Sequence, residues 1–229
     1  MTVTRRWPLL MACGLGRRKP GSGDWLMSGV CLEVGPGDRL AIIGPSGAGK
    51  TVLLRAIAML DPIEEGTIHV RGRAIPREAI PMYRSEVIYL HQRPALLDGS
   101  VATNLEHPYS LKVHRMKRFD RARIVDLLGG LGRDEVFLDD SSRDLSGGEA
   151  QIVALLRAIQ LDPAVLLLDE PTASLDQGAA RAIEGLIGRW LEEDSEGRAV
   201  VWVSHDMEQA RRVSTRRLAM QSGRLGPEG

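Results

Sequence analysis

Residues 44–51 read GPSGAGKT, and this stretch constrains the fold of the chain more than any other. The apolar run RLAII (39–43) precedes it and predicts a buried strand, and TVLLRAIAML (51–60) follows and predicts a helix. Three glycines let the connecting backbone curl so that successive N–H groups face one anion, and the helix N-terminus favours negative charge there. A strand, a glycine-rich loop and a helix in this order predict a phosphate-binding loop.

The predicted loop matches the pattern G-x-x-x-x-G-K-[ST] at every position, the P-loop of proteins that bind ATP with Mg²⁺. We expect Lys50 to reach the outer phosphates of ATP and the hydroxyl of Thr51 to bind Mg²⁺. The expected nucleotide-binding residues of the loop are Gly44, Pro45, Ser46, Gly47, Ala48, Gly49, Lys50, Thr51 and Val52.

Strand-like and helix-like runs alternate along the rest of the chain, which predicts an α/β fold with a mainly parallel central sheet. The all-apolar run AVLLLDE (164–170) is typical of a central parallel strand. GAARAIEGLIGRWLEE (178–193) predicts a helix, AVVWVSHD (199–206) a further strand, and RRLAMQSGRLGPEG (216–229) a small hairpin. The resulting expectation is a P-loop NTPase fold.

Two regions are expected to depart from this alternation. Residues 9–43 contain short strands with turn signals, which we assign to an antiparallel β subdomain. Residues 93–148 have helical spacing, mixed charge and no buried strand, and predict a helical subdomain. We therefore expect a single domain over residues 1–229, in which 1–92 and 149–229 form the catalytic core with the β subdomain.

Polar side chains follow three predicted strands, where parallel strands would bring them to one edge of the sheet. Asp169 is expected to hold Mg²⁺, and Glu170 is expected to act as general base for an attacking water. Adjacent strand residues point to opposite sides, so the two carboxylates are expected to differ in role. His205 is expected to contact the γ-phosphate or the water, and Gln92 to reach Mg²⁺ or the water. The predicted reaction is hydrolysis of ATP.

The stretch LSGGEAQ (145–151) is a second helix start of phosphate-binding type, for which a chain acting alone has no evident use. Together with GPSGAGKT, Gln92, LLLDEP (166–171), SLD (174–176) and His205, it makes the sequence resemble the ATPase subunit of an ABC transporter over nearly the whole chain. The resemblance implies a head-to-tail dimer of two copies, with each ATP held between the P-loop of one copy and the LSGGE of the other. Ser146, Gly147 and Gly148 would then bind the γ-phosphate in trans.

The resemblance also implies an integral membrane permease as a separate subunit, contacting roughly residues 93–144. The stretch QRPALLDGSVATNLEHPYSLK (92–112) and the short chain resemble the ATPase subunits of Fet-type iron-efflux systems. Subunits of phosphate or amino-acid importers are the main alternative, and a non-transport ABC ATPase is a further one. The implied location is cytoplasmic, peripheral on the inner face of the cell membrane.

The sequence departs from the family pattern at the base of the nucleotide. The family usually stacks adenine on an aromatic side chain about two dozen or more residues before the P-loop lysine, where this chain has Arg17, Arg18 and Lys19, with Trp25 nearby. An arginine plane could replace the aromatic ring through a cation–π contact. The residue after LSGGE is Ala150 instead of the common Lys or Arg.

The charge balance and the cysteine content bear on two further binding partners, nucleic acid and zinc. Lys and Arg number 30, and Asp and Glu also number 30, so the chain lacks the basic excess typical of nucleic-acid-binding proteins, and we expect no nucleic acid partner. The two cysteines, Cys13 and Cys31, form no zinc-ligand pair and are expected to be reduced thiols. TRRWPLLMACGLGRR (4–18) has a weak signal-peptide appearance, but we assign it to the first strand of the domain.

Overall fold

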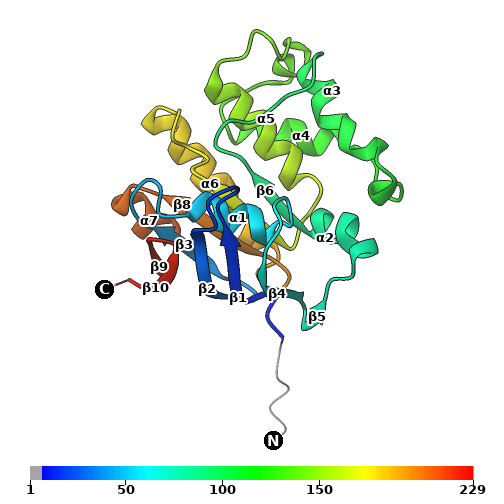
Figure 1. Ribbon diagram of the computed structural model, residues 1–229. Coiled ribbons are helices and arrows are strands. Elements are labelled where there is room, and N and C mark those ends of the chain that lie inside the picture. Colours follow the sequence, from blue (N-terminus) through cyan, green and yellow to red (C-terminus); the bar gives the residue numbers. More distant parts are fainter. Residues whose placement is uncertain (1–6, 229) are drawn as a thin grey trace, which may run out of the picture.

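A computed structural model of the protein describes residues 7–228. Its centre is a sheet with the strand order β10-β9-β3-β8-β7-β6, in which all neighbours are parallel except β10, which is antiparallel to β9 (Figure 1). The strands are β3 (Arg39–Ile43), β6 (Val87–Leu90), β7 (Val165–Asp169), β8 (Ala199–Ser204), β9 (Arg216–Gln221) and β10 (Arg224–Pro227). The predicted α/β fold with a mainly parallel sheet is confirmed.

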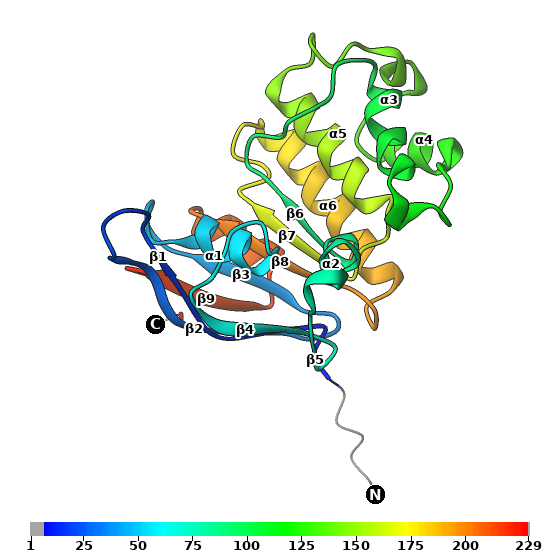
Figure 2. The same ribbon diagram turned by 45° about the vertical axis from the view of Figure 1, so that its right-hand side comes forward.

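A second, antiparallel sheet has the order β2-β1-β4-β5. Its strands are β1 (Leu10–Arg18), β2 (Trp25–Val34), β4 (Glu65–Val70) and β5 (Arg73–Ala74). In Figure 2 this sheet lies along the lower side of the molecule, away from the helices that follow β6. The strand expected within residues 4–18 is therefore β1, although residues 4–6 lie outside the described part of the chain.

The helices are α1 (Lys50–Ile57), α2 (Ile80–Glu86), α3 (Val101–Glu106), α4 (Arg121–Gly129), α5 (Gly147–Ile159), α6 (Gln177–Glu193) and α7 (Met207–Val213). Within the predicted helical subdomain, residues 93–148, the structure contains α3, α4 and short 3₁₀ turns. Figures 1 and 2 show these helices above the central sheet, joined to it through α5. None of the helices within residues 7–228 is both long and apolar enough to cross a membrane.

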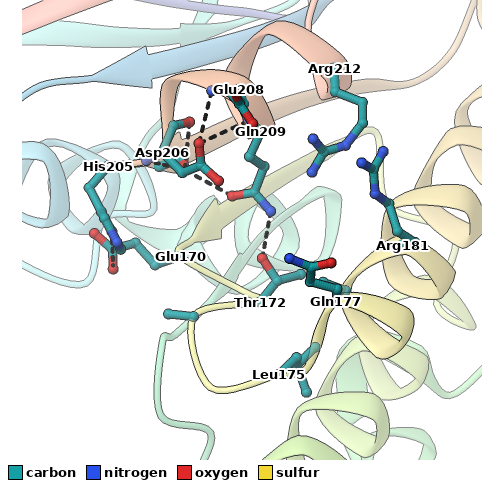
Figure 3. Close-up of a pocket in the computed structure, with 13 residues that line it drawn as sticks. Glu170, Thr172, Leu175, Gln177, Arg181, His205, Asp206, Glu208, Gln209 and Arg212 are labelled. Atoms are coloured by element: carbon teal, nitrogen blue, oxygen red, sulfur yellow. Dashed lines mark hydrogen bonds and ion pairs between the residues drawn. The ribbon is translucent and has the colours of Figure 1, made fainter.

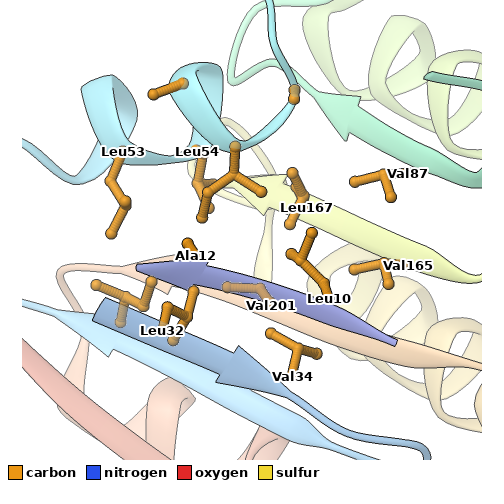
Figure 4. Packing of buried hydrophobic residues seen from close by; sticks show 14 of the residues in the cluster. Leu10, Ala12, Leu32, Val34, Leu53, Leu54, Val87, Val165, Leu167 and Val201 are labelled. Atoms are coloured by element: carbon orange, nitrogen blue, oxygen red, sulfur yellow. The ribbon is translucent and has the colours of Figure 1, made fainter. Parts of the chain in front are cut away.

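The central sheet divides the buried hydrophobic residues into two main clusters, because successive side chains of a strand point to opposite faces. Val165 and Leu167 of β7 pack in a cluster that includes α1, β1 and β2 (Figure 4). Leu166 and Leu168 of the same strand pack in the other cluster, with α5, α6 and the helical subdomain. Every residue of β7 is buried, as expected for a central parallel strand.

Two details of local structure were not predicted. α1 ends at Ile57 and not near residue 60, because Met59 takes a left-handed conformation with φ of 54°. The N–H of Leu60 bonds to the carbonyl of Arg55 and the N–H of Met59 to that of Ala56, the bonding pattern of a Schellman helix end. Glycine usually marks such an end, and its absence concealed this one. The short helix α2 follows a Pro-containing stretch and carried no clear periodic signal.

Candidate active site

The loop of residues 44–51 joins β3 to α1 with the backbone curl that its glycines permit. Gly44, Gly47 and Gly49 have φ values of 149°, 78° and 104°, all in the region that favours glycine. α1 begins at Lys50, which is buried, and its Nζ donates to the carbonyls of Gly44 at 2.6 Å and Pro45 at 2.9 Å. The structure therefore places an ammonium group inside the curl, at the N-terminus of a helix, where it favours a bound anion.

The carboxylate of Asp169 ends β7 and is held from two sides. Its Oδ1 accepts a hydrogen bond from Thr51 Oγ1 at 3.1 Å, and its Oδ2 accepts one from the hydroxyl of Tyr89 on β6 at 2.8 Å. Partial burial and the negative charge of Asp169 raise the pKa of Tyr89, so its hydroxyl remains a donor. The predicted Mg²⁺ ligands Thr51 and Asp169 thus lie side by side, and a hydroxyl and a carboxylate are oxygen ligands of the kind that Mg²⁺ prefers.

Glu170 follows β7 directly and has a left-handed backbone conformation, with φ of 47°. Its carboxylate has different partners from that of Asp169. Its Oε2 accepts a hydrogen bond from Gln92 Nε2 at 3.1 Å and lies 3.1 Å from His205 Nδ1. Gln92 follows β6 and His205 follows β8, the two strands beside β7, so the sheet brings all three side chains together. Of the three residues expected to reach Mg²⁺, Thr51 and Asp169 contact each other, whereas Gln92 contacts Glu170 instead.

The side chains of His205 and Glu170 differ in their exposure to solvent. The side chain of His205 is 61% exposed, whereas that of Glu170 is 19% exposed. A cavity of about 280 Å³ opens beside this pair and is lined by the end of β8, by α7, by the segment between β7 and α6, and by the first turns of α6 (Figure 3). A water molecule beside Glu170 would therefore have access from solvent and a carboxylate to accept its proton.

Ser146 begins α5 as part of a complete capping box. Its hydroxyl accepts the N–H of Glu149 at 3.3 Å, and its own N–H donates to Glu149 Oε2 at 2.9 Å. The Ser146 hydroxyl also donates to Glu149 Oε2 at 2.7 Å, and this bond, the bond from the Ser146 N–H and the adjacent Arg133 at 3.0 Å hold the pKa of Glu149 below its ordinary value. A Cβ added at Gly147 would meet nothing within 4 Å, so the space beside the start of α5 is open.

Ser146, Gly147 and Gly148, called the signature residues from here on, and the P-loop (residues 44–51) do not form one site within a single chain. Among residues 7–228, no hydrogen bond or ion pair joins Ser146, Gly147 or Gly148 to residues 44–51. Leu175, in the segment between β7 and α6, lies beside the start of α5: its Cδ2 would lie 2.7 Å from a Cβ added at Gly148. Within one chain, the P-loop and the signature residues are therefore two separate structures that do not contact each other.

The region where the base of a nucleotide is expected carries an arginine and a tryptophan. The guanidinium carbon of Arg18 lies 3.9 Å from the ring centre of Trp25, a stacked cation–π pair. Arg17 is turned away, because its Nη1 pairs with Asp61 at 2.6 Å and its side chain is 15% exposed. Of the candidates in the sequence, Arg18 with Trp25 is therefore the flat surface that the structure presents.

Three residues near the site belong to none of the sequence motifs described above. Tyr89 is one of them, and its hydroxyl bonds to Asp169. Thr172 and Gln209 were not singled out, yet they bond to each other at 2.6 Å behind Glu170 and His205. Among the described residues no cluster of three or more His, Cys, Asp or Glu side chains could hold a metal ion.

Comparisons with known proteins agree with this geometry. The family model described as ABC transporter matches residues 27–173. The "Probable anion import ATP-binding protein" of Haloferax volcanii is 39% identical over 223 residues, which cover 89% of this chain and 75% of that protein. The "Probable iron export ATP-binding protein FetA" of Escherichia coli is 33% identical over 184 residues, 80% of each chain. The dimeric structure of the bacterial ABC transporter cassette MJ0796 superposes with a TM-score of 0.82 at 25% identity, covering 94% of this chain and 96% of that one.

Proposed function

This chain belongs to the ABC transporter family and is an ATPase, and from that premise we propose that it closes as a dimer around ATP to drive a separate permease. The observation that carries the proposal is the pairing of a P-loop and a signature helix start in one chain that do not meet each other. Two copies packed head to tail would bring the two halves together twice. ATP is the ligand, and ADP lacks the γ-phosphate that both halves would bind.

In the proposed mechanism the loop residues bind the phosphates, and the residues at the sheet edge hold the metal and activate water. Lys50 and the backbone N–H groups of the loop bind the phosphates, and Thr51 and Asp169 would hold Mg²⁺, which neutralises charge on the phosphates when bound. Glu170 accepts the proton of the attacking water, and a general base contributes typically about 10²- to 10⁴-fold. His205 and Gln92 orient that carboxylate and the water through their contacts with Glu170.

The signature residues supply the second side of the site in this proposal. Ser146, Gly147 and Gly148 of one copy bind the γ-phosphate held by the P-loop of the other, so that helix N-termini face the triphosphate from both sides. Closing then depends on the γ-phosphate, and its hydrolysis releases the contact. The turn Ser174–Asp176, which precedes α6, lies beside the signature through Leu175 and would cross the dimer interface.

For the transported substrate we propose a metal ion such as iron, moved outward, as the name of the FetA relative states for that protein. The similarity of residues 92–112 to Fet-type subunits supports this assignment. Import of an anion such as phosphate, or of an amino acid, is the second candidate, favoured by the 39% identity to the anion import protein. The proposed location is the cytoplasmic, inner face of the cell membrane, with residues 93–144 against the permease. A soluble ABC ATPase without a permease is the remaining alternative.

Purification of the tagged chain from its native membranes in mild detergent tests this function. We expect a multi-span membrane protein in stoichiometric amount, and its sequence class separates metal export from binding-protein-dependent import. Recovery with soluble or ribosomal proteins alone contradicts the transport role. In parallel, Glu170→Gln should abolish most phosphate release while ATP binding persists. Full activity of that variant would remove Glu170 from its proposed role as the base.

A further inference from the structure

The side-chain amide of Gln209 connects three elements behind the proposed catalytic pair. Gln209 lies on α7 and is buried, at 8% exposed. Its Oε1 accepts the hydroxyl of Ser204 at 2.8 Å, and its Nε2 donates to Thr172 Oγ1 at 2.6 Å and to Glu184 Oε1 at 3.0 Å. Figure 3 shows the amide directed between the segment after β7 and the end of β8.

The partners of this amide are next to the residues that face the attacking water. Ser204 is the last residue of β8 and immediately precedes His205. Thr172 is two residues after Glu170, separated from it by a proline, and the N–H of Ala173 bonds back to the Glu170 carbonyl at 3.2 Å. The amide therefore joins the two segments that carry Glu170 and His205 by a single side chain.

The third partner makes the position of the amide rigid. Glu184 on α6 accepts two hydrogen bonds from the guanidinium of Arg212, at 2.7 and 2.8 Å. Burial alone would raise the pKa of Glu184, but the bonds from Arg212 and Gln209 outweigh it and hold that pKa below its ordinary value. A charged carboxylate thus fixes one N–H of the amide, and the other N–H points at Thr172.

The same segment continues to the signature helix. The N–H of Leu175 bonds to the Thr172 carbonyl at 3.1 Å, and Leu175 packs against Gly148 at the start of α5. A continuous path of contacts therefore runs from His205 through Ser204, Gln209 and Thr172 to Leu175. At one end this path reaches His205 of the proposed catalytic pair. At the other end Leu175 lies beside Gly148, which is proposed to bind the ATP of the other copy.

We propose that Gln209 is a positioning residue for hydrolysis, which holds the Glu170 and His205 segments at a fixed separation. This inference rests on the proposed roles of Glu170 and His205. An amide with two donors and one acceptor satisfies all three partners at once, whereas a carboxylate has no donor for Glu184 and an aliphatic side chain has neither. Gln209 has no hydrogen bond or ion pair to residues 44–52, so its contribution falls on turnover and not on nucleotide affinity.

The test compares ATP turnover of Gln209→Met with that of the wild-type chain, because Met has a similar volume and no amide. We expect kcat to fall between about tenfold and about a hundredfold, the range for a misplacement of catalytic groups by up to about 1 Å. KM for ATP should change little. Thr172→Val should reproduce the loss, and the double variant should be no worse than the more impaired single one, because both remove the same connection.

Ser214→Ala is the matched control. Ser214 follows α7, is equally buried at 9% exposed, and its hydroxyl donates to Ala210 at 2.6 Å without touching the catalytic segments. It should lower the thermal stability but leave kcat unchanged. An unchanged kcat in folded Gln209→Met and Thr172→Val, or a loss confined to KM, overturns the inference. Glu170→Gln measured alongside separates this failure from failure of the proposed base, because that variant keeps Gln209 and its partners and removes only the carboxylate of Glu170.

Discussion

Two glycines of the P-loop differ in what surrounds them, and this difference gives a quantitative prediction for alanine substitution. Both have positive φ, 149° at Gly44 and 78° at Gly47. A Cβ at Gly44 would lie 2.1 Å from the carbonyl oxygen of Met220, which belongs to β9, whereas a Cβ at Gly47 would meet nothing within 4 Å. The two substitutions therefore share a backbone penalty, and only Gly44→Ala adds a collision.

The expected destabilisation follows from these distances. Gly47→Ala should cost about 1–2 kcal/mol for an alanine in a left-handed conformation. Gly44→Ala combines backbone strain of about 1–3 kcal/mol with about 1–3 kcal/mol for displacing packed neighbours, about 2–6 kcal/mol in total. Met220 is fully buried between neighbouring strands, so its carbonyl cannot move away without disturbing the sheet.

Thermal unfolding of the nucleotide-free variants is the assay. At about 2–4 °C per kcal/mol for a chain of this size, Gly47→Ala should lower Tm by about 2–8 °C, and Gly44→Ala by about 4–24 °C. Binding should show a different pattern, because Gly47 belongs to the loop proposed to bind the phosphates and an added methyl group would point into the open space there. Gly47→Ala should therefore fold but bind ATP weakly. Equal losses of stability in the two variants, or a larger one at Gly47, would refute the reasoning.

Two further predictions concern the metal side of the site and the signature helix. Tyr89→Phe removes the second hydrogen bond to Asp169 and should raise the Mg²⁺ concentration needed for half-maximal ATPase activity by about 10- to 100-fold, measured by titration at saturating ATP. Glu149→Ala breaks the capping box at Ser146 and should lower the unfolding free energy by about 1 kcal/mol at pH 7. Because the pKa of Glu149 is depressed in the fold, this difference should be present above about pH 4.3 and disappear as the pH falls further, in denaturant unfolding at several pH values.

The parts of the site that were predictable depend on local patterns and on strand direction. The motif GPSGAGKT predicts a curled phosphate-binding loop from its glycines alone. The apolar run AVLLLDE predicts that Asp169 and Glu170 lie at the end of a strand. Parallel strands have their carboxyl ends at one edge, so Gln92 and His205 could be expected near Glu170 before their contacts were seen. The fold class followed from the same alternation of strands and helices.

The remaining contacts depend on which strands are neighbours and in what register. Tyr89 reaches Asp169 because β6 lies beside β7, which the order of strands in the sequence does not specify. Gln209 and Thr172 are 37 residues apart, and no motif connects them. Arg17 faces Asp61 while Arg18 faces Trp25, a choice set by the irregular pairing at the end of β1.

The measurement that tests the central claim most directly is the molar mass of Glu170→Gln in solution, by size-exclusion chromatography with light scattering. The variant retains Lys50 and the signature residues but lacks the proposed base, so bound ATP should persist. Saturating Mg-ATP should convert the chain to twice its monomer mass, whereas Mg-ADP should leave it monomeric. A monomer at saturating Mg-ATP would contradict a site shared between two copies.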